Sequence, residues 1–210
     1  MGPTVLGVPQ EPGFNIRQRG LRFHKMIKGK LTYLRPLEKA DLPVLIKGLN
    51  AEEVMWHLGP HFPFTERQAE VWLERLNASE EGKIFAICDK KGRVVGEVSL
   101  DRIHHRNRQA ELVIALFDPA DWGHGYGSDA LRTLLRFLFE DMNFHRVQLL
   151  VHEDNERAIR IYEKLGFVRE GRLRDENFRG GRYTATLLMA VLAGEFKGYS
   201  VTGRSRPGVE

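Results

Sequence analysis

The sequence predicts an α/β fold, because a buried strand, a glycine-rich turn and an amphipathic helix follow one another near the middle of the chain. Residues 112–117 form a continuous apolar run of strand length, which is typical of a strand buried on both faces. Residues 122–127 hold three glycines at alternate positions and predict a sharp turn. Apolar side chains then recur at helical spacing, at Ala130, Leu131, Leu134, Leu135 and Leu138.

Further strands and helices alternate along the rest of the chain. Short apolar runs bounded by turn residues predict strands at residues 31–36, 83–89, 93–100, 109–117, 146–151, 167–173 and 183–192. Helical spacing predicts helices at residues 39–49 and 65–76, from the glycine turn to Glu140, and at residues 155–165. Between the first two helices, residues 52–64 form a short passage rich in aromatic side chains.

Local signals mark where several of these helices begin and end. Thr65 and Gln68 have the spacing of a capping box, in which each side chain bonds the other residue's backbone N–H. Pro43 suits the first turn of its helix, since proline has no N–H that needs a partner. Asn155 is a favourable N-cap, and Gly166 stands where a left-handed C-terminal stop is expected.

Charge divides the 210 residues into three parts. Residues 1–27 predict an irregular basic extension, residues 28–192 the folded domain and residues 193–210 a tail. Residues 1–30 carry a net charge of +5, residues 31–192 about −2 and residues 193–210 +1, so the basicity lies near the N-terminus, which argues against a dedicated nucleic-acid-binding protein. Contact of the arm with RNA or the ribosome, and a homodimer, stay open as alternatives.

Cysteine content and hydropathy indicate the compartment. Cys88 is the single cysteine, so an internal disulfide is impossible, and it has no motif of a covalent nucleophile around it. No apolar run is long enough for a signal-peptide core or a membrane span. We therefore expect a soluble cytoplasmic protein without a membrane partner.

The glycine-rich turn is a candidate site for a phosphate or pyrophosphate, because unblocked backbone N–H groups and the positive end of the following helix point the same way. A Walker loop is excluded, since Gly127 is followed by Ser128 and not by lysine. A dinucleotide fingerprint can be written with Gly125, Gly127 and Ala130. However, five residues separate that turn from the strand, and a single strand–helix pair follows, so an oxidoreductase is the minor alternative.

Two blocks of sequence resemble the GCN5-related N-acetyltransferase (GNAT) family. The first is Ala110-Glu111-Leu112, then Asp118-Pro119, then Trp-Gly-His-Gly-Tyr-Gly at residues 122–127, which is similar to motif A of that family. The second is the phrase Asn-Glu-Arg-Ala-Ile-Arg-Ile-Tyr-Glu-Lys-Leu-Gly-Phe at residues 155–167. The resemblance covers roughly residues 28–192 and is closest to the ribosomal-protein-alanine and polyamine acetyltransferase branch, from Pro63-Phe64-Thr65, Trp72-Leu73 and Gly181-Arg182-Tyr183.

This resemblance implies a mixed, mostly antiparallel sheet of about seven strands, flanked by about four helices and splayed at a cleft for acetyl-CoA. Backbone N–H groups of the glycine turn would bind the pyrophosphate, and the end of the central strand would lie along the pantetheine arm. Trp122 replaces the Gln or Arg that is commonest at the first position of the motif. The implied cofactor-binding residues are Leu116, Phe117, Trp122, Gly123, His124, Gly125, Tyr126, Gly127, Ser128, Asn155 and Ala158.

Acetyl transfer to an amine needs a neutral amine and an acid that protonates the leaving thiolate. Tyr162 is the candidate acid: a phenol of pKa about 10 stays protonated at neutral pH, and the resemblance implies the same role. Glu111, at the mouth of the apolar strand, is the candidate base, directly or through water. Some family members carry a glutamate at the position of Leu150, and leucine cannot accept a proton, so His152 and water stay open.

The acceptor site is the least determined part of the prediction. The fold implies that residues 50–64 and 175–183 form it, and Glu52 and Glu53 are candidates to attract a cationic amine. The histidines at positions 57, 61, 104 and 105 lack the spacing of metal ligands, so we predict no metal. We expect an acetyl-CoA-dependent N-acetyltransferase acting by direct attack of a primary amine, either a protein N-terminus or a small molecule such as a polyamine. The alternative from another class is a non-catalytic acetyl-CoA-binding module.

Overall fold

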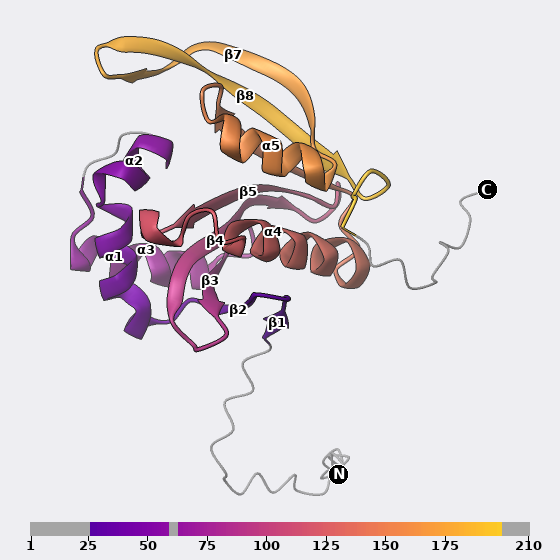
Figure 1. The fold of residues 1–210 in the computed structure, drawn as a ribbon. Coiled ribbons are helices and arrows are strands. Elements are labelled where there is room, and N and C mark those ends of the chain that lie inside the picture. The colour runs from indigo at the N-terminus through magenta and orange to yellow at the C-terminus, as the bar shows by residue number, and fades with distance from the viewer. Residues whose placement is uncertain (1–25, 59–62, 199–210) are drawn as a thin grey trace, which may run out of the picture.

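The computed structural model describes residues 26–58 and 63–198, which form one eight-stranded sheet with helices on both faces (Figure 1). The strands are β1 (Ile27–Lys28), β2 (Thr32–Pro36), β3 (Lys83–Asp89), β4 (Val94–His104), β5 (Gln109–Leu116), β6 (Arg146–His152), β7 (Val168–Arg179) and β8 (Arg182–Leu192). Their order across the sheet is β1-β2-β3-β4-β5-β6-β8-β7.

Five α-helices connect the strands. They are α1 (Leu42–Leu49), α2 (Glu52–Leu58), α3 (Glu66–Ala78), α4 (Tyr126–Arg136) and α5 (Glu156–Leu165). Two 3₁₀ turns, η1 (Lys39–Asp41) and η2 (Pro119–Asp121), precede α1 and the glycine-rich turn, and a π-helical segment, η3 (Phe137–Asp141), continues α4. Within the described ranges, no helix has the length and apolar character needed to span a bilayer.

A single pair of neighbouring strands runs parallel, and it interrupts an otherwise antiparallel sheet. β5 and β6 share three residue pairs, Gln109 with Arg146, Ala110 with Val147 and Glu111 with Gln148, and then separate. Parallel neighbours need a crossover connection, and α4 with η3 supplies it. The predicted mixed, mostly antiparallel sheet that splays at its centre is thus confirmed.

Two hydrophobic cores lie on opposite faces of the sheet. The larger one packs α4 and α5 against one face and includes Leu100, Leu112, Leu134, Leu149 and Met189. The smaller one packs α1, α2 and α3 against the other face around Leu45, Val54, Leu73, Ala86 and Phe117. In Figure 1 the three N-terminal helices lie at the left and α4 and α5 toward the centre and right.

The helix caps predicted from the sequence are present in the structure. Each depends on residues that are close in sequence. The side chains of Thr65 and Gln68 form the reciprocal capping box at the start of α3. Asn155 Oδ1 accepts the backbone N–H of Ala158 at 3.2 Å, which caps α5. Gly166 ends that helix with a φ of 103°, a left-handed conformation that favours glycine.

The largest departure from the sequence prediction is the length of the last hairpin. Strands were expected to stop at Leu173 and to restart at Tyr183, but β7 continues to Arg179 and β8 starts at Arg182. Its outer half is polar and mostly exposed, so the apolar pattern that marks a strand is missing there. Gly180 and Gly181 join the strands with φ values of 56° and 76°, which suits a two-residue hairpin turn.

Smaller departures arise at the edges of the fold. The aromatic passage contains α2, the short strand β1 adds to the edge of the sheet, and β4 runs on to His104 through the expected polar turn. The chain also packs beyond Leu192. Phe196 is buried against Phe139 with ring centroids 5.5 Å apart, and the backbone N–H of Lys197 donates to the carbonyl of Leu165 at 3.0 Å.

One acidic side chain is buried in the sheet with an oxygen that has no hydrogen-bond partner among the described residues. Glu97 of β4 is 4% exposed, and its Oε2 is sealed from solvent with no hydrogen-bond partner among the described residues. Burial raises the pKa of Glu97 to about 8, and the nearby Asp101 carboxylate adds to the shift. The folded protein therefore keeps a proton on this group that the unfolded chain releases near pH 4.5.

This difference in the pKa of Glu97 between the folded and unfolded states predicts that the stability of the protein depends on pH. Because the folded-state pKa is raised, stability falls as pH rises from about 4.5 to about 8. Relative to Glu97→Gln, the wild-type free energy of unfolding should decline by about 1.4 kcal/mol per pH unit within that window. Urea denaturation at pH 5.5, 6.5 and 7.5 measures it, with the exposed Glu53→Gln as the matched control. Parallel wild-type and Glu97→Gln curves would contradict the assignment.

Candidate active site

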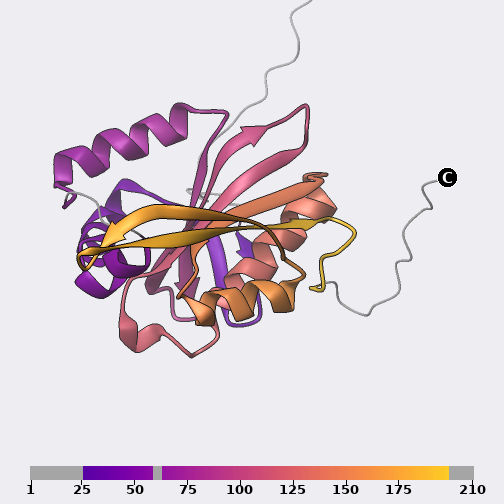
Figure 2. The same cartoon turned by 90° about the horizontal axis from the view of Figure 1, so that it is seen from above.

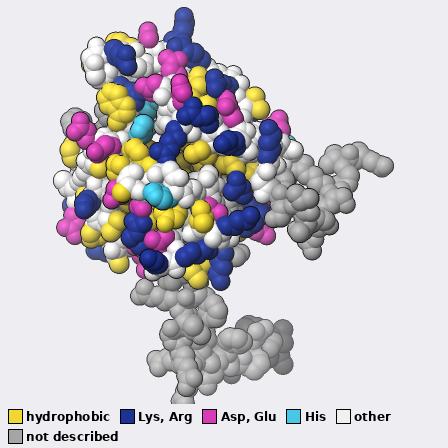
Figure 3. Space-filling view, viewed as in Figure 1, with side chains coloured by type: hydrophobic (Ala, Val, Ile, Leu, Met, Phe, Trp, Pro, Cys, Tyr) yellow, Lys and Arg dark blue, Asp and Glu magenta, His cyan; other side chains and the backbone are white. Residues whose placement is uncertain are grey.

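A cleft of about 710 Å³ opens where β5 and β6 part. Its walls come from β5, β6, the glycine-rich turn with the start of α4, most of the length of α5, one end of α2 and the β7–β8 hairpin. Figure 3 shows one side of the molecule. A band of apolar side chains crosses its middle and is bordered by Lys and Arg side chains. The cleft therefore connects the two faces of the sheet at the place where the sheet is interrupted.

The glycine-rich turn forms one end of the cleft. Gly123 and Gly125 have φ values of 88° and 86°, and Gly125 is the N-cap of α4. The hydroxyl of Ser128 donates to the carbonyl of Gly125 at 3.1 Å, which tightens the first turn of the helix. The first N–H groups of α4 have no partners within the helix, so this turn is suited to bind an anionic group.

Two interactions fix the residues that lead into this turn. Arg93 donates two hydrogen bonds to Asp121 of η2, at 2.7 and 2.8 Å. The indole Nε1–H of Trp122 donates to the carbonyl of Leu116 at 3.3 Å. The five residues between strand and turn, which differ from a dinucleotide fingerprint, thus contain an ordered 3₁₀ turn that is held to the β3–β4 turn and to the end of β5.

A buried carboxylate holds the first turn of α4 in place. Asp129 accepts hydrogen bonds from the backbone N–H groups of Lys30, Leu31 and Thr32, and from the Thr32 hydroxyl, at 2.8 to 3.0 Å. Desolvation alone would raise the pKa of Asp129, but these donors outweigh it and the pKa is lowered. The helix that begins the phosphate-binding turn is therefore tied to the turn between β1 and β2.

Cations and carboxylates occupy different walls of the cleft. The cations that line it, Arg157, Arg160 and Lys164, all come from α5. The carboxylates that line it, Glu111 and Glu176, come from β5 and from the hairpin. The three cations were missed in the sequence, although their spacing on one helix just after Asn155 was a usable signal.

Tyr162 lies in the cleft wall with its phenol largely buried. It is 8% exposed and packs against Phe167, with ring centroids 5.6 Å apart. Desolvation raises the pKa of Tyr162 to about 12. The hydroxyl therefore stays protonated throughout the physiological pH range and can act as a proton donor.

Glu111 stands at the last shared pair of β5 and β6. Its Oε2 accepts hydrogen bonds from Arg102 at 2.9 Å and from the Gln148 amide at 3.3 Å. Arg102 is largely exposed, whereas the Glu111 side chain is only 13% exposed. Asp101, the cross-strand partner of Glu111, has a raised pKa because of desolvation and the adjacent Glu111 charge.

Histidine and amide side chains complete the wall of the cleft. His57 of α2 packs edge-on against Trp122, with ring centroids 5.4 Å apart, and His152 ends β6. The Asn177 amide donates to the Thr186 hydroxyl at 2.5 Å within the hairpin. All of these residues line the cleft. Trp122 was a predicted cofactor-binding residue, and His57 and Asn177 fall within the ranges expected to form the acceptor site, whereas the sequence did not single out Thr186.

Most of the predicted site residues come together in this cleft. Those that line it are Glu111, Leu116, Trp122, Gly123, Gly125, Tyr126, Gly127, Ser128, Asn155, Ala158 and Tyr162. Phe117 points to the other face, where its ring packs against Gly48 in the smaller core. His124 is exposed and lies beside the ring of Tyr126 outside the cleft wall. Glu52 and Glu53 are exposed as well, and His61 lies outside the described residues.

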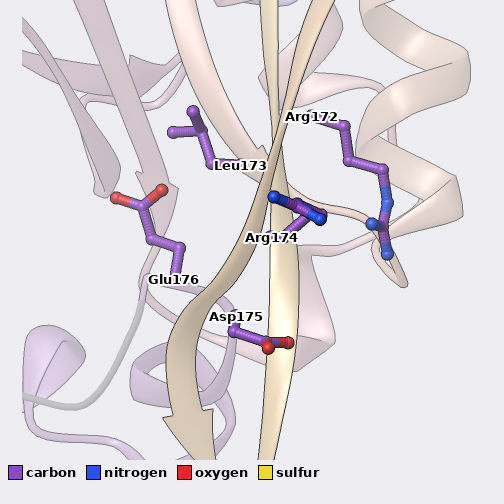
Figure 4. Close-up of a pocket in the computed structure, with 5 residues that line it drawn as sticks. All are labelled: Arg172, Leu173, Arg174, Asp175 and Glu176. Carbon is purple, nitrogen blue, oxygen red and sulfur yellow. The ribbon is translucent and has the colours of Figure 1, made fainter.

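A second hollow lies on the outer part of β7 (Figure 4). It is lined by five consecutive residues, from Arg172 to Glu176, around a bulge where Asp175 has a φ of 53°. No other element contributes a wall, and Arg172 already pairs with Glu153 at 2.7 Å. The hollow follows from the bulge, and the large cleft is the candidate active site.

Comparison with known proteins defines the class. Residues 32–168 match the family model described as an acetyltransferase (GNAT) domain, which is more than half of the chain. The chain belongs to the GNAT family and is an acetyl-CoA-dependent N-acetyltransferase that acetylates an amine. The resemblance in the sequence is thereby confirmed.

The proteins similar to this chain include spermidine acetyltransferases. The chain is 32% identical to spermidine N(1)-acetyltransferase of Escherichia coli strain K12, covering 78% of this chain and 87% of that protein. It is 30% identical to spermidine N(1)-acetyltransferase of Vibrio cholerae, covering 78% and 94%. A crystal structure of spermidine N-acetyltransferase from Vibrio cholerae in complex with CoA and spermine superposes with a TM-score of 0.74, at 27% identity, over 79% of this chain and 97% of that one.

The geometry of the glycine turn predicts a selective loss of cofactor binding. Gly125→Ala forces a side chain into a left-handed conformation at the N-cap of α4, so the N–H groups there should shift and CoA should bind about tenfold more weakly. Gly92→Ala, in the β3–β4 turn with a φ of 91°, is the matched control. Both variants should lose about 1–2 kcal/mol of stability. Equal CoA dissociation constants by titration calorimetry would rule out the proposed role of the turn.

Proposed function

We propose that the acceptor is an aliphatic amine with two or more cationic nitrogens, a polyamine, acetylated on a primary amine. The observation that carries this proposal is the division of charge in the cleft. The cations of α5 suit the phosphates of CoA, and Glu111 and Glu176 offer two carboxylates on other walls. A protein N-terminus would present one cationic nitrogen to these two carboxylates, whereas a polyamine presents one cationic nitrogen to each carboxylate. The named activity of the spermidine-acetylating relatives supports the same class.

We further propose that Glu111 receives the proton of the attacking amine, directly or through one water molecule. Arg102, its partner, is largely exposed, and exposed ion pairs contribute little stability, so an incoming ammonium can take its place. Gln148 would hold the carboxylate in position during the exchange. The neutral nitrogen then attacks the thioester carbonyl, the C–N bond forms and the C–S bond breaks.

Tyr162 is proposed as the acid that protonates the leaving sulfur. Its raised pKa keeps the proton on the phenol until a thiolate develops beside it. The nitrogen gives up two protons in all: Glu111 takes one before the attack, and the second, released as the amide forms, passes to the Tyr162 phenolate left when the sulfur is protonated, directly or through water. Glu111 then releases its proton to solvent, which restores both side chains for the next cycle.

An acceptor panel tests the substrate class. Release of the CoA thiol would be measured with spermidine, a diamine, a monoamine of matched length and a peptide with a free N-terminus. The second carboxylate should give the polyamine at least about tenfold higher kcat/KM than the monoamine, which corresponds to one charged contact of about 1.4 kcal/mol. A preference for the peptide or the monoamine would overturn the proposed class.

Two substitutions test the proposed residues. Tyr162→Phe keeps the ring but removes the proton donor, so kcat should fall about 100-fold or more while CoA binding is unchanged. Glu111→Gln should lower kcat/KM for the amine by about 100-fold for the corresponding loss of a base. Tyr183→Phe, on the exposed hairpin, is the matched control. Wild-type rates in the first two variants would leave both residues without a chemical role.

A further inference from the structure

A buried arginine stands at the tip of an exposed hairpin. Arg179 ends β7 next to Phe178 and near Tyr183, whose side chains are 56% and 64% exposed, yet Arg179 itself is 6% exposed. A charged group is rarely buried unless it is paired. The position of this side chain therefore needs a specific explanation.

Arg179 joins three segments that are far apart in the sequence. Its Nη1 donates to the backbone carbonyl of Trp56 in α2 at 2.6 Å, and its Nη2 donates to both carboxylate oxygens of Asp154 in the β6–α5 loop. The guanidinium also stacks over the Trp56 ring, 4.6 Å from its centroid. Figures 1 and 2 both show the hairpin reaching from the sheet toward α2. We refer to Trp56, Asp154 and Arg179 as the Arg179 cluster.

Each partner of Arg179 lies next to a residue of the cleft wall. Trp56 is followed by His57, and Asp154 comes two residues after His152 and just before Asn155, all three of which line the cleft. The hairpin itself contributes Asn177 to the same wall, two residues before Arg179. The Arg179 cluster thus fixes the relative positions of α2, the end of β6 and the hairpin around one half of the cleft.

Burial and nearby charges favour the neutral form of both histidine rings. Desolvation, and after it the Arg179 charge, lowers the pKa of His57 and of His152. Asp154 acts in the opposite direction on both rings, Arg157 of α5 lowers the pKa of His57 further, and His57 lowers that of His152. The Nδ1 of His152 is sealed from solvent without a partner among the described residues, so a proton there would be poorly solvated.

We propose that Arg179 is a positioning residue for the acceptor: through the Arg179 cluster it holds His57 as an uncharged hydrogen-bond acceptor, and His152 as an uncharged ring, along the path of the incoming amine. An imidazolium would repel an ammonium substrate and has no free lone pair, whereas a neutral imidazole accepts a hydrogen bond from it. This inference rests on the proposed amine acceptor. It assigns to the hairpin tip a role in acceptor binding and not in cofactor binding.

Histidine titration by NMR tests the inference without any substrate. The Cε1–H resonances of His57 and His152, assigned with His57→Gln and His152→Gln, would be followed with pH in the wild type, Arg179→Met and Arg179→Lys. In Arg179→Met both pKa values should rise by about one unit, since a nearby cation has been removed. Arg179→Lys retains the charge and should stay close to the wild type. Unchanged pKa values in Arg179→Met would overturn the electrostatic part of the proposal.

Kinetics of the same variants test the effect on the acceptor. In Arg179→Met the KM for the amine should rise about tenfold, because the rings lose their fixed positions as well as part of their neutral form and one hydrogen bond to the amine is lost, whereas the dissociation constant of CoA stays within twofold. Arg179→Lys should recover part of this loss. Arg172→Met, which removes the exposed pair with Glu153 on the same hairpin, is the matched control. A lower melting temperature with unchanged KM would show that Arg179 is only structural.

The two proposals fail in different ways. If the acceptor is not a polyamine, the panel of amines reports it with the wild-type enzyme, while the histidine pKa values still respond to Arg179→Met. If Arg179 does not control the histidines, their titration reports it even though polyamines are acetylated. Asp154→Asn tests the opposite direction of the effect, because removal of this carboxylate should lower both histidine pKa values further.

Discussion

The early end of the pairing between β5 and β6 is the constraint on which the site depends. The two strands share three residue pairs and then diverge, although each continues for several residues beside its antiparallel neighbour. Backbone groups along the open edges are left for a ligand, in the same way that an edge strand accepts an added peptide. Several residues of the cleft lie on or next to these edges: Glu111 at the branch point, Leu116 and His152 at the ends, and Tyr162 on the helix that follows β6.

Separate long-range contacts hold the two halves of this opening. On the cofactor side, Asp129 ties the start of α4 to the β1–β2 turn, and Arg93 holds η2. On the other side, Arg179 connects the hairpin with α2 and with the loop before α5. None of these partners is a neighbour in sequence, so each contact fixes a loop against an element formed elsewhere in the chain. The loops that contribute to the cleft wall are therefore held in place by distant elements of the fold.

The features that could be read from the sequence are those decided within a few residues. The capping box at Thr65, the stop at Gly166 and the glycine turn follow from local backbone chemistry. The run at residues 112–117 was correct as a strand, but a continuous apolar run does not indicate which side chains face the cleft, and Leu116 and Phe117 go to opposite faces. The contact of Arg179 with Trp56 spans 123 residues, and the outer half of β7 lacks the apolar pattern of a strand, so periodicity reports neither feature.

The exposed edge of β7 bears on whether copies of this protein aggregate through strand pairing. A long strand at the edge of a sheet presents unpaired N–H and C=O groups, to which a strand of another chain can add. Here that edge is rich in charge, with Arg169, Glu170, Arg172 and Arg174 exposed, and its register is broken by bulges before Gly171 and before Asn177. Charged side chains and bulges are the features by which natural sheets resist edge-to-edge growth. The hairpin can therefore extend far enough to reach α2 without becoming a template for aggregation.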